Sequence, residues 1–580
     1  MFRIERRAGF PRGVVFITAS SNSFNHHQSR LESMNGADVV ADILKREGTE
    51  FLACYPRNPV IDACAAIDIR PILCRQERIG VGMADGFSRI RRGKQNGVFA
   101  AQHGAGIENA FAGVAQAYSE NVPMLVIPAA FGPDRQYIRP TFRAADSYRT
   151  VTKWSAYVHS AKEIPDTMRR AYQAMRSGKP GPVMVEIPNE VFEEKWEGKV
   201  DYVPVPVMRA APDPEDVKKA AKMLLAAKNP VLWAGQGVIY AEASDRLAEL
   251  AAMIPAPVVC TNPGKSALPE KHPLSLGGST RSQSKMFAEF MNRADLVFAI
   301  GSSLTKTSFG PVVPKGKVIV HSTNDASDIN KDYRADHGLV GDAALVLDAL
   351  IAEVARQKGK GDGKALTAMQ DEIAAIKKAW LAEWSKHFES NEVPINQYRV
   401  IGELMRAVNS DDTIITHDSG SPREQLLPFW QTSRPGTYMG WGKSTQLGYG
   451  LGIIMGAKLA SPKSTCINVM GDCSFGMSGM DIETASRNGI AILTVVFNNQ
   501  VMACERAVMK TSTEKFGALS VGGNYSKVAE GLNVPSRRVD KPADVAGAVK
   551  EALTTLQSGK PYLLEIVAKE GYDFSRYMAH

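Results

Sequence analysis

Residues 471–499, GDCSFGMSGMDIETASRNGIAILTVVFNN, decide the fold of this chain. Apolar runs at 465–470 and 490–497 predict two buried strands, and residues 479–488 between them predict a helix. A strand, loop, helix, strand unit places its two strands parallel in one sheet. Asp472 and Asn499 then follow the carboxyl ends of these strands, at the edge where parallel sheets bind ligands.

The oxygen atoms at this edge suit a small hard cation that holds a diphosphate. Asp472 offers a carboxylate oxygen, Asn499 an amide oxygen and Val501 a backbone carbonyl, which leaves octahedral positions for phosphate oxygens and water. Gly471 and the small residues after Asp472 let backbone N–H groups approach the phosphates. The stretch therefore predicts Mg²⁺ bound by Asp472, Asn499 and Val501.

Composition indicates a multidomain globular protein. The 580 residues predict three or four domains, and 44% hydrophobic content is enough for several cores. No run of eighteen apolar residues occurs, so we expect no membrane span. The formal charge of +8 is spread along the chain without a basic, aromatic-rich arm, so we expect no nucleic-acid partner. Seven cysteines without a CxxC pair predict reduced thiols and a cytoplasmic location.

Alternating helical and strand-like patterns divide the chain into three α/β domains. The expected N-terminal domain covers 34–200, the central domain 211–355 and the C-terminal domain 394–580, with a Gly-rich linker and a helix at 356–393. Residues 1–33 lack the apolar core of a secretory signal, so we expect a disordered extension without a function of its own.

Motifs along the chain resemble the acetolactate (acetohydroxyacid) synthase-like family of thiamine diphosphate enzymes. The GD and NN pairs at 471–472 and 498–499 are similar to the family's diphosphate signature. Further matching phrases are RQE (75–77), MADGFSR (83–89), HGAGIEN (103–109), SGKPGPVMVEIP (177–188), GKSALPEKHPLSLG (264–277) and GKSTQLGYG (442–450). The resemblance implies three doubly wound α/β domains: a pyrimidine-binding domain, a central domain and a diphosphate-binding domain.

The resemblance also implies roles for single residues. Glu77 would hydrogen-bond N1′ of the aminopyrimidine, and an apolar surround would raise its pKa so that it shares a proton with the ring. The Thr445 carbonyl would accept from the exocyclic amine, and Leu447 would wedge beneath the cofactor to hold its two rings in a V. The remaining cofactor contacts would come from Asp418, Ser419, Gly471, Asp472, Cys473, Ser474 and Asn499.

Three residues depart from the acetolactate synthase pattern and point to the substrate. Arg57 replaces a turn glycine and could bind a carboxylate through two hydrogen bonds. His103 replaces a serine beside the expected carbonyl site and could transfer a proton near neutral pH. Glu505 follows Asn499 by six residues, the spacing of an active-site Glu in enzymes that resemble pyruvate decarboxylase. A surface or packing role is the alternative for each.

The expected activity is decarboxylation of a 2-oxo acid, with transfer of the acyl carbanion to a carbonyl acceptor. The resemblance implies a homodimer or homotetramer with active sites between subunits. Two alternatives stay open: a lyase or decarboxylase of a CoA thioester, with CoA on the central domain beneath a lid from 571–580, and a non-catalytic relative. FAD is a further open cofactor, although the loops at 234–238 and 302–310 lack the arginines expected for its contacts.

Overall fold

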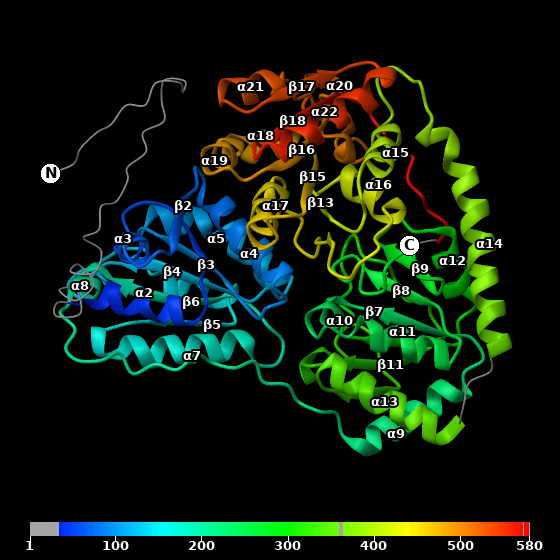
Figure 1. Cartoon of the computed structure of the whole chain (residues 1–580), viewed down its shortest axis with the longest axis horizontal. Helices are drawn as coiled ribbons and strands as arrows, with labels where there is room; N and C mark the ends of the chain where they lie inside the picture. The colour runs from blue at the N-terminus through cyan, green and yellow to red at the C-terminus, as the bar shows by residue number, and fades with distance from the viewer. Residues whose placement is uncertain (1–33, 359–362, 572, 579–580) are drawn as a thin grey trace.

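The computed structural model describes residues 34–358, 363–571 and 573–578, so the extension expected at 1–33 lies outside the described residues. Figure 1 shows three α/β units, the first in blue and cyan, the second in green and the third in yellow to red. Each unit is built on one six-stranded sheet whose strands are all parallel. This confirms the predicted fold class of three doubly wound α/β domains.

The N-terminal sheet has the strand order β2-β1-β3-β4-β6-β5. Its strands are β1 (Phe51–Cys54), β2 (Arg70–Leu73), β3 (Gly97–Ala101), β4 (Met124–Ala130), β5 (Trp154–Tyr157) and β6 (Val183–Pro188). Its longer helices are α2 (Gly36–Arg46), α4 (Glu77–Ile90), α5 (Ala105–Ser119) and α7 (Ile164–Arg176). The chain changes direction between β1 and β3, and this switch point is where doubly wound sheets bind ligands.

The C-terminal sheet repeats this topology. Its order is β14-β13-β15-β16-β18-β17, which is the N-terminal order when strands are counted along each domain. The strands are β13 (Thr413–His417), β14 (Tyr438–Met439), β15 (Thr465–Gly471), β16 (Ile492–Asn498), β17 (Ser536–Val539) and β18 (Tyr562–Val567). Its helices include α15 (Gln397–Ala407), α16 (Ser421–Phe429), α17 (Tyr449–Ala460), α18 (Asp472–Ser478), α19 (Ile482–Asn488), α20 (Lys510–Phe516) and α22 (Val545–Gln557). Its switch point lies between β13 and β15.

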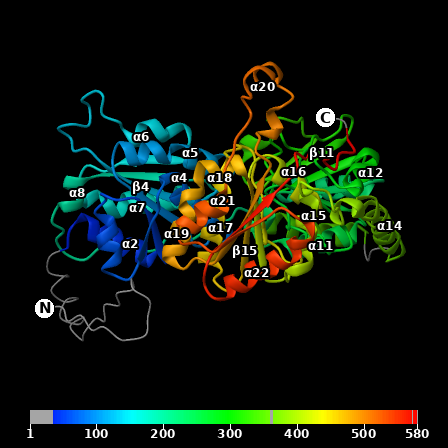
Figure 2. The same cartoon turned by 90° about the horizontal axis from the view of Figure 1, so that it is seen from above.

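The central sheet has the order β12-β11-β10-β7-β8-β9, the order of a dinucleotide-binding fold. Its strands are β7 (Pro230–Ala234), β8 (Val258–Thr261), β9 (Ser275–Ser279), β10 (Leu296–Ile300), β11 (Val318–Thr323) and β12 (His337–Val340). Its last helix, α13 (Ala343–Lys358), is followed by the long α14 (Gly363–Phe388) along the edge of the molecule in Figure 1, while α20 projects from the body in Figure 2. In the described parts of the chain, no helix is both long and apolar enough to cross a membrane.

The helix predicted for 479–488 begins earlier than expected. Helical backbone starts at Asp472 with α18 and reaches Asn488 through a short 3₁₀ turn, η4 (Gly479–Asp481), and α19. Gly476 and Gly479 are weak helix formers and make this part of the sequence resemble a loop. Burial of Phe475 and Ile482 in a shared apolar cluster outweighs that weakness.

Equivalent helices of the two outer domains pack directly together. α4 follows β2 and α17 follows β14, and Figure 1 shows them side by side between the two sheets. A Cβ atom at Gly86 would lie 2.0 Å from the carbonyl oxygen of Ile453, and one at Gly456 would lie 2.0 Å from that of Met83. Only glycine permits this approach, and side chains from both helices form one continuous core around it.

We predict that Gly456→Ala weakens the joint between the two domains. The added methyl would overlap backbone atoms, so the expected loss of stability is at the upper end of the roughly 1–3 kcal/mol seen for overpacked cores. Urea denaturation measures it. Gly547→Ala is the matched control, because Gly547 is exposed in α22 with open space around its Cβ position, and it should stabilise by about 0.5–1 kcal/mol. Equal midpoints for Gly456→Ala and the wild type would contradict the packing.

Candidate active site

Arg57 and His103 follow the two strands of the N-terminal switch point. Arg57 is exposed and has a left-handed backbone with φ +64°. This conformation favours glycine, which explains why the family pattern has glycine at this turn. The buried Asn58 side chain donates to the carbonyls of Ala101 at 3.0 Å and Ile127 at 2.9 Å, which ties the turn to β3 and β4. Asn58 was not among the predicted site residues, because its backbone partners are distant in the chain.

His103 presents an unprotonated ring at this edge. Its ring packs edge-on against Phe131, with centroids 4.2 Å apart. Burial and the Arg57 guanidinium lower the pKa of His103, while Glu190 opposes the shift. The buried Nδ1 atom has no hydrogen-bond partner among the described residues. A neutral imidazole with an available nitrogen is suited to accept a proton.

Glu77 is the first residue of α4 and is only 4% exposed. Burial raises the pKa of Glu77, and hydrogen bonds from its own backbone N–H and from the Asn109 side chain partly offset this rise. A carboxyl group in this setting can hold and share a proton. Asn109 lies in the HGAGIEN motif but was not among the predicted site residues.

The turn before α4 contacts the C-terminal domain of the same chain. The Arg75 backbone N–H donates to Asp481 Oδ1 at 2.8 Å, and its Nε atom donates to Glu483 at 2.9 Å. Arg78 donates to the carbonyl of Met477 at 3.1 Å. These acceptors lie on α18, η4 and α19, the helices that follow the GD motif. The donors Arg75 and Arg78 are within two residues of Glu77, so Glu77 lies close to this contact.

Asp418 organises the C-terminal switch point. Its fully buried carboxylate accepts from the backbone N–H groups of Ser419 at 2.8 Å, Gly448 at 2.9 Å and Gly450 at 3.0 Å. This geometry favours a positioning role for Asp418, because it ties the loop after β13 to the start of α17. The Ser419 hydroxyl is buried and has no partner among the described residues, so it is available to a ligand.

The predicted cation ligands meet beyond β15 and β16. The Asp472 carboxylate accepts from Cys473 N–H and Gln500 N–H, each at 2.7 Å, and burial raises its pKa. Asn499 Oδ1 accepts from Val501 N–H at 3.2 Å. Each oxygen keeps a lone pair for a cation. The described residues contain no cluster of three His, Cys, Asp or Glu side chains suited to a metal, and the predicted site has only one carboxylate.

Cys473, Ser474 and Glu505 lie around this edge. Burial and Asp472 raise the pKa of Cys473 to about 12, so its thiol is protonated at neutral pH and acts as a small filler. Ser474 is buried in α18. Glu505 is exposed on the turn η5 (Ala503–Glu505), where Cys504 Sγ lies 3.5 Å from Ser421 Oγ. The structure thus places Cys504, the residue before Glu505, beside the loop after β13.

Thr445 and Leu447 lie in an irregular segment before α17, and both are half-buried. The Gln446 side chain between them donates to the carbonyl of Ala112 on α5. The structure therefore brings this segment against the helix that carries Asn109, the partner of Glu77. Two predicted parts of a cofactor site, from different domains, face the same helix.

Family models match the chain in all three domains. The thiamine pyrophosphate enzyme N-terminal TPP binding domain matches residues 34–140, the central domain matches 217–350 and the C-terminal TPP binding domain matches 418–566. This chain belongs to the thiamine pyrophosphate enzymes. The predicted thiamine diphosphate dependence is confirmed.

Relatives of this thiamine pyrophosphate enzyme are similar along nearly their whole length. The probable acetolactate synthase large subunit of Methanocaldococcus jannaschii is 29% identical over 562 residues, with 92% of each chain covered. Acetolactate synthase isozyme 3 large subunit of Escherichia coli K12 is 26% identical, covering 92% of this chain and 95% of the relative. Glyoxylate carboligase of E. coli O157:H7 is 26% identical, covering 93% of each. The predicted carboligase or decarboxylase class is confirmed.

The residues at the C-terminal switch point fit the diphosphate of the cofactor. Cβ positions at Gly471 and Gly476 have open space within 4 Å. The buried Ser419 hydroxyl supplies an unused hydrogen-bonding group beside them. Asp472 and Asn499 keep oxygens for a cation. The enzyme therefore has room, donors and cation ligands together at the predicted position.

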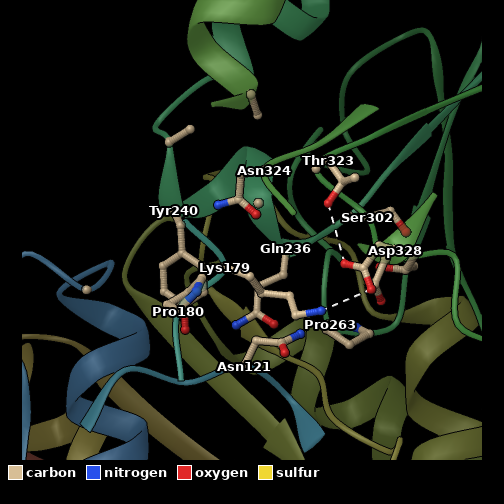
Figure 3. Close-up of a pocket in the computed structure, with 18 of the residues that line it drawn as sticks. Asn121, Lys179, Pro180, Gln236, Tyr240, Pro263, Ser302, Thr323, Asn324 and Asp328 are labelled. Atoms are coloured by element: carbon tan, nitrogen blue, oxygen red, sulfur yellow. Dashed lines mark hydrogen bonds and ion pairs between the residues drawn. The ribbon is translucent and has the colours of Figure 1, made fainter. Parts of the chain in front are cut away.

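A separate cavity of about 820 Å³ lies where the three domains meet. Figure 3 shows Lys179 of the N-terminal domain reaching Asp328 of the central domain, 3.0 Å away, beside Gln236 and Ser302. Loops after β7 and β10 line it, as expected at the central switch point. Among the described residues, none of those predicted to bind thiamine diphosphate lines this cavity. FAD stays an open cofactor for this enzyme, and the absorbance spectrum of the purified protein tests whether it is bound.

The tail of the enzyme does not line this cavity in its described part. Ser575 is buried and donates to the carbonyl of Gln283 at 2.6 Å, while Trp384 on α14 donates to the Tyr577 hydroxyl at 3.2 Å. The tail is thus packed on α14 and the central domain. This placement does not support the lid that a CoA-dependent reaction would require.

We predict that Asp481 makes the joint beside Glu77 sensitive to pH. Burial raises the pKa of Asp481 to about 6. The folded protein then binds this proton more tightly than the unfolded chain does. Protonation of Asp481 therefore stabilises the fold fully below about pH 4, and this stabilisation is lost as the pH rises through about 6. Asp481→Asn keeps the acceptor for Arg75 N–H but cannot titrate.

The free-energy difference between wild type and Asp481→Asn should therefore change by up to about 3 kcal/mol between pH 4 and 7. Urea denaturation at a series of pH values measures it. Parallel pH profiles for the two proteins would rule out the titration of Asp481.

Proposed function

We propose that this enzyme decarboxylates a 2-oxo acid and transfers the resulting acyl carbanion to a carbonyl acceptor, with thiamine diphosphate and Mg²⁺. The observation that carries the substrate class is the guanidinium of Arg57 beside the neutral imidazole of His103 at the N-terminal switch point. A guanidinium recognises a carboxylate through paired hydrogen bonds. The name of one relative, glyoxylate carboligase, also states a ligation of a 2-oxo acid.

The chemistry that thiamine diphosphate supplies when bound is a nucleophilic carbon that adds to a carbonyl and takes up the electrons of the broken C–C bond. Glu77 would share a proton with the aminopyrimidine N1′ atom, and burial, which raises the pKa of Glu77, favours this role. Thr445 would offer its carbonyl to the exocyclic amine, and Leu447 would support the cofactor.

The substrate groups are handled by side chains on the loops. Arg57 would orient the carboxylate of the 2-oxo acid, the group that is lost as CO₂. His103 is neutral and offers a ring nitrogen, so it can take up and return a proton at the substrate oxygen. Glu505, exposed on η5, would assist proton transfer from the C-terminal domain.

Mg²⁺ bound by Asp472, Asn499 and the Val501 carbonyl would neutralise the diphosphate. The set contains only oxygen donors, which suits a hard cation that keeps water and phosphate oxygens in its shell. The small residues around Gly471 leave space for the phosphates.

We predict CO₂ release from a 2-oxo acid in a single-turnover assay. The purified protein, with thiamine diphosphate and Mg²⁺, receives pyruvate, glyoxylate, an aromatic 2-oxo acid and a 2-hydroxyacyl-CoA in parallel. CO₂ with an aldehyde or acyloin supports the proposal. Cleavage of the thioester alone would replace it with a CoA-dependent lyase.

Glu77→Gln should lower turnover at least about 100-fold, the usual contribution of a general acid or base. Glu50→Gln is the matched control, since Glu50 is exposed and pairs with Arg91 at 2.8 Å. Activity of Glu77→Gln within tenfold of wild type would refute the proposed role.

The enzyme is further proposed to be a homodimer, or a homotetramer built from such dimers. Met477 and Met480 beside the site are 49% and 51% exposed, and Phe516 on α20 is 83% exposed. Large apolar side chains that are exposed in a single chain support cover by another chain. The resemblance predicts that one subunit supplies Glu77 and the other Asp472.

We predict that Asp472→Asn loses Mg²⁺-dependent retention of thiamine diphosphate, measured by calorimetric titration. Asp540→Asn, at an exposed position in the same domain, should bind like wild type. Mixing Glu77→Gln with Asp472→Asn chains after co-expression tests the shared site. If subunits share it, each mixed dimer has one intact site and activity returns; if each chain builds its own site, the mixture stays inactive.

A further inference from the structure

A buried glutamate at the end of α5 holds the segment that the proposed function assigns to the aminopyrimidine. Glu120 directly follows α5 and is fully buried. Its Oε1 atom accepts from the backbone N–H groups of Gly442 and Lys443, each at 2.7 Å. One carboxylate of the N-terminal domain thus fixes two successive amides of the C-terminal domain.

The same segment is fixed at its other end by a second carboxylate. Gly448 N–H donates to Asp418 at 2.9 Å, and Gln446 N–H contacts Gln116 at 3.4 Å. Thr445 and Leu447 stand between these anchors and belong to neither a helix nor a strand. Their positions therefore depend on side-chain hydrogen bonds and not on a regular backbone ladder.

The charge of Glu120 is incompletely matched. Its Oε2 atom is buried and has no hydrogen-bond partner among the described residues. The Lys443 ammonium interacts with its charge, but donates to Ser303 Oγ of the central domain at 3.3 Å. Burying a carboxylate is costly unless it makes strong interactions. Here those interactions are two charge-assisted hydrogen bonds to the segment, which are about twice as strong as neutral ones.

We infer that Glu120 is a positioning residue for catalysis. By holding the amides of Gly442 and Lys443, it sets the Thr445 carbonyl and the Leu447 side chain against the aminopyrimidine ring. If the segment moved, the exocyclic amine would lie farther from the reactive carbon, while the diphosphate would stay anchored at Asp472. This inference rests on the roles of Thr445 and Leu447 in the proposed function.

Two substitutions separate the charge from the contacts. Glu120→Gln keeps the size and one acceptor oxygen but removes the charge, and Glu120→Ala removes both hydrogen bonds. In the cofactor-free protein, amides of residues 440–448 should exchange with deuterium at least about tenfold faster in Glu120→Ala, with a smaller increase in Glu120→Gln, by mass spectrometry.

A second measurement follows the geometry of the bound cofactor. With thiamine diphosphate and Mg²⁺, the hydrogen at the thiazolium C2 position should exchange with solvent at least about tenfold more slowly in Glu120→Ala, by quenched-flow NMR, because the amine that removes it is displaced. Cofactor affinity should change less than about threefold, since the diphosphate contacts are intact.

Glu186→Gln is the matched control. Glu186 is also a buried carboxylate that accepts from two successive backbone amides, Ala144 at 3.0 Å and Ala145 at 2.7 Å, but it holds another segment. It should leave both exchange rates at wild-type values. If Glu186→Gln slowed C2-hydrogen exchange as much as the Glu120 substitutions do, the effect would be a general loss of stability and not a loss of positioning by Glu120.

Wild-type rates of amide exchange and of C2-hydrogen exchange in both Glu120 variants would overturn the inference. If Glu120→Ala does not fold, the rates of Glu120→Gln alone test it. A wild-type protein that never exchanges the C2 hydrogen would defeat the proposed function instead. The amide measurement needs no cofactor, so it still decides whether Glu120 holds the segment.

Discussion

The contact of backbone with backbone between α4 and α17 is the constraint on which the arrangement of the two outer domains depends. Gly86 and Gly456 bring each helix against carbonyl oxygens of the other. The distance between the two helix axes and the position of one helix along the other are therefore fixed. Because the two outer sheets share one strand order, these helices are equivalent. They cross where a Cβ atom at Gly82 would lie 3.0 Å from Gly452 Cα. Glu77 begins one helix and Gly448 precedes the other, so the contact fixes the positions of these two residues relative to each other within one chain.

Buried carboxylates hold the irregular segments around this joint. Asp418, Glu120, Asp472 and Asp481 each accept backbone N–H groups from loops that have no ladder of their own. Burial raises the pKa of the three aspartates, which shows that solvent is largely excluded from them. In such surroundings a charged acceptor binds amides strongly, and a lost acceptor leaves a buried N–H unsatisfied. The backbone positions of these loops are thus well defined, although the loops contain no regular secondary structure.

The fold could be predicted from the sequence because alternating apolar runs and turns reveal parallel strands directly, and family phrases fix their order. The GD and NN pairs and Glu77 could be found because they sit in such phrases. Asn58 and Glu120 could not, since their partners are backbone atoms brought close only by the folded chain. The early start of α18 was hidden for a related reason: its glycines disfavour a helix locally, and tertiary burial of Phe475 reverses the preference.

The residues proposed to select the substrate are ones that the scaffold does not need. Relatives share 26–29% identity over most of their length, and the cofactor motifs fall within the shared fold. Arg57 is exposed and makes no contribution to a core, yet it keeps a left-handed backbone with φ +64°. A non-glycine residue in this conformation costs on the order of 1 kcal/mol, and such strain gathers at functional sites. Glycine would occupy the turn without strain. We therefore propose that the guanidinium is the reason for arginine at this position, and that this edge, with the neutral His103 beside Arg57, recognises a carboxylate next to a carbonyl group.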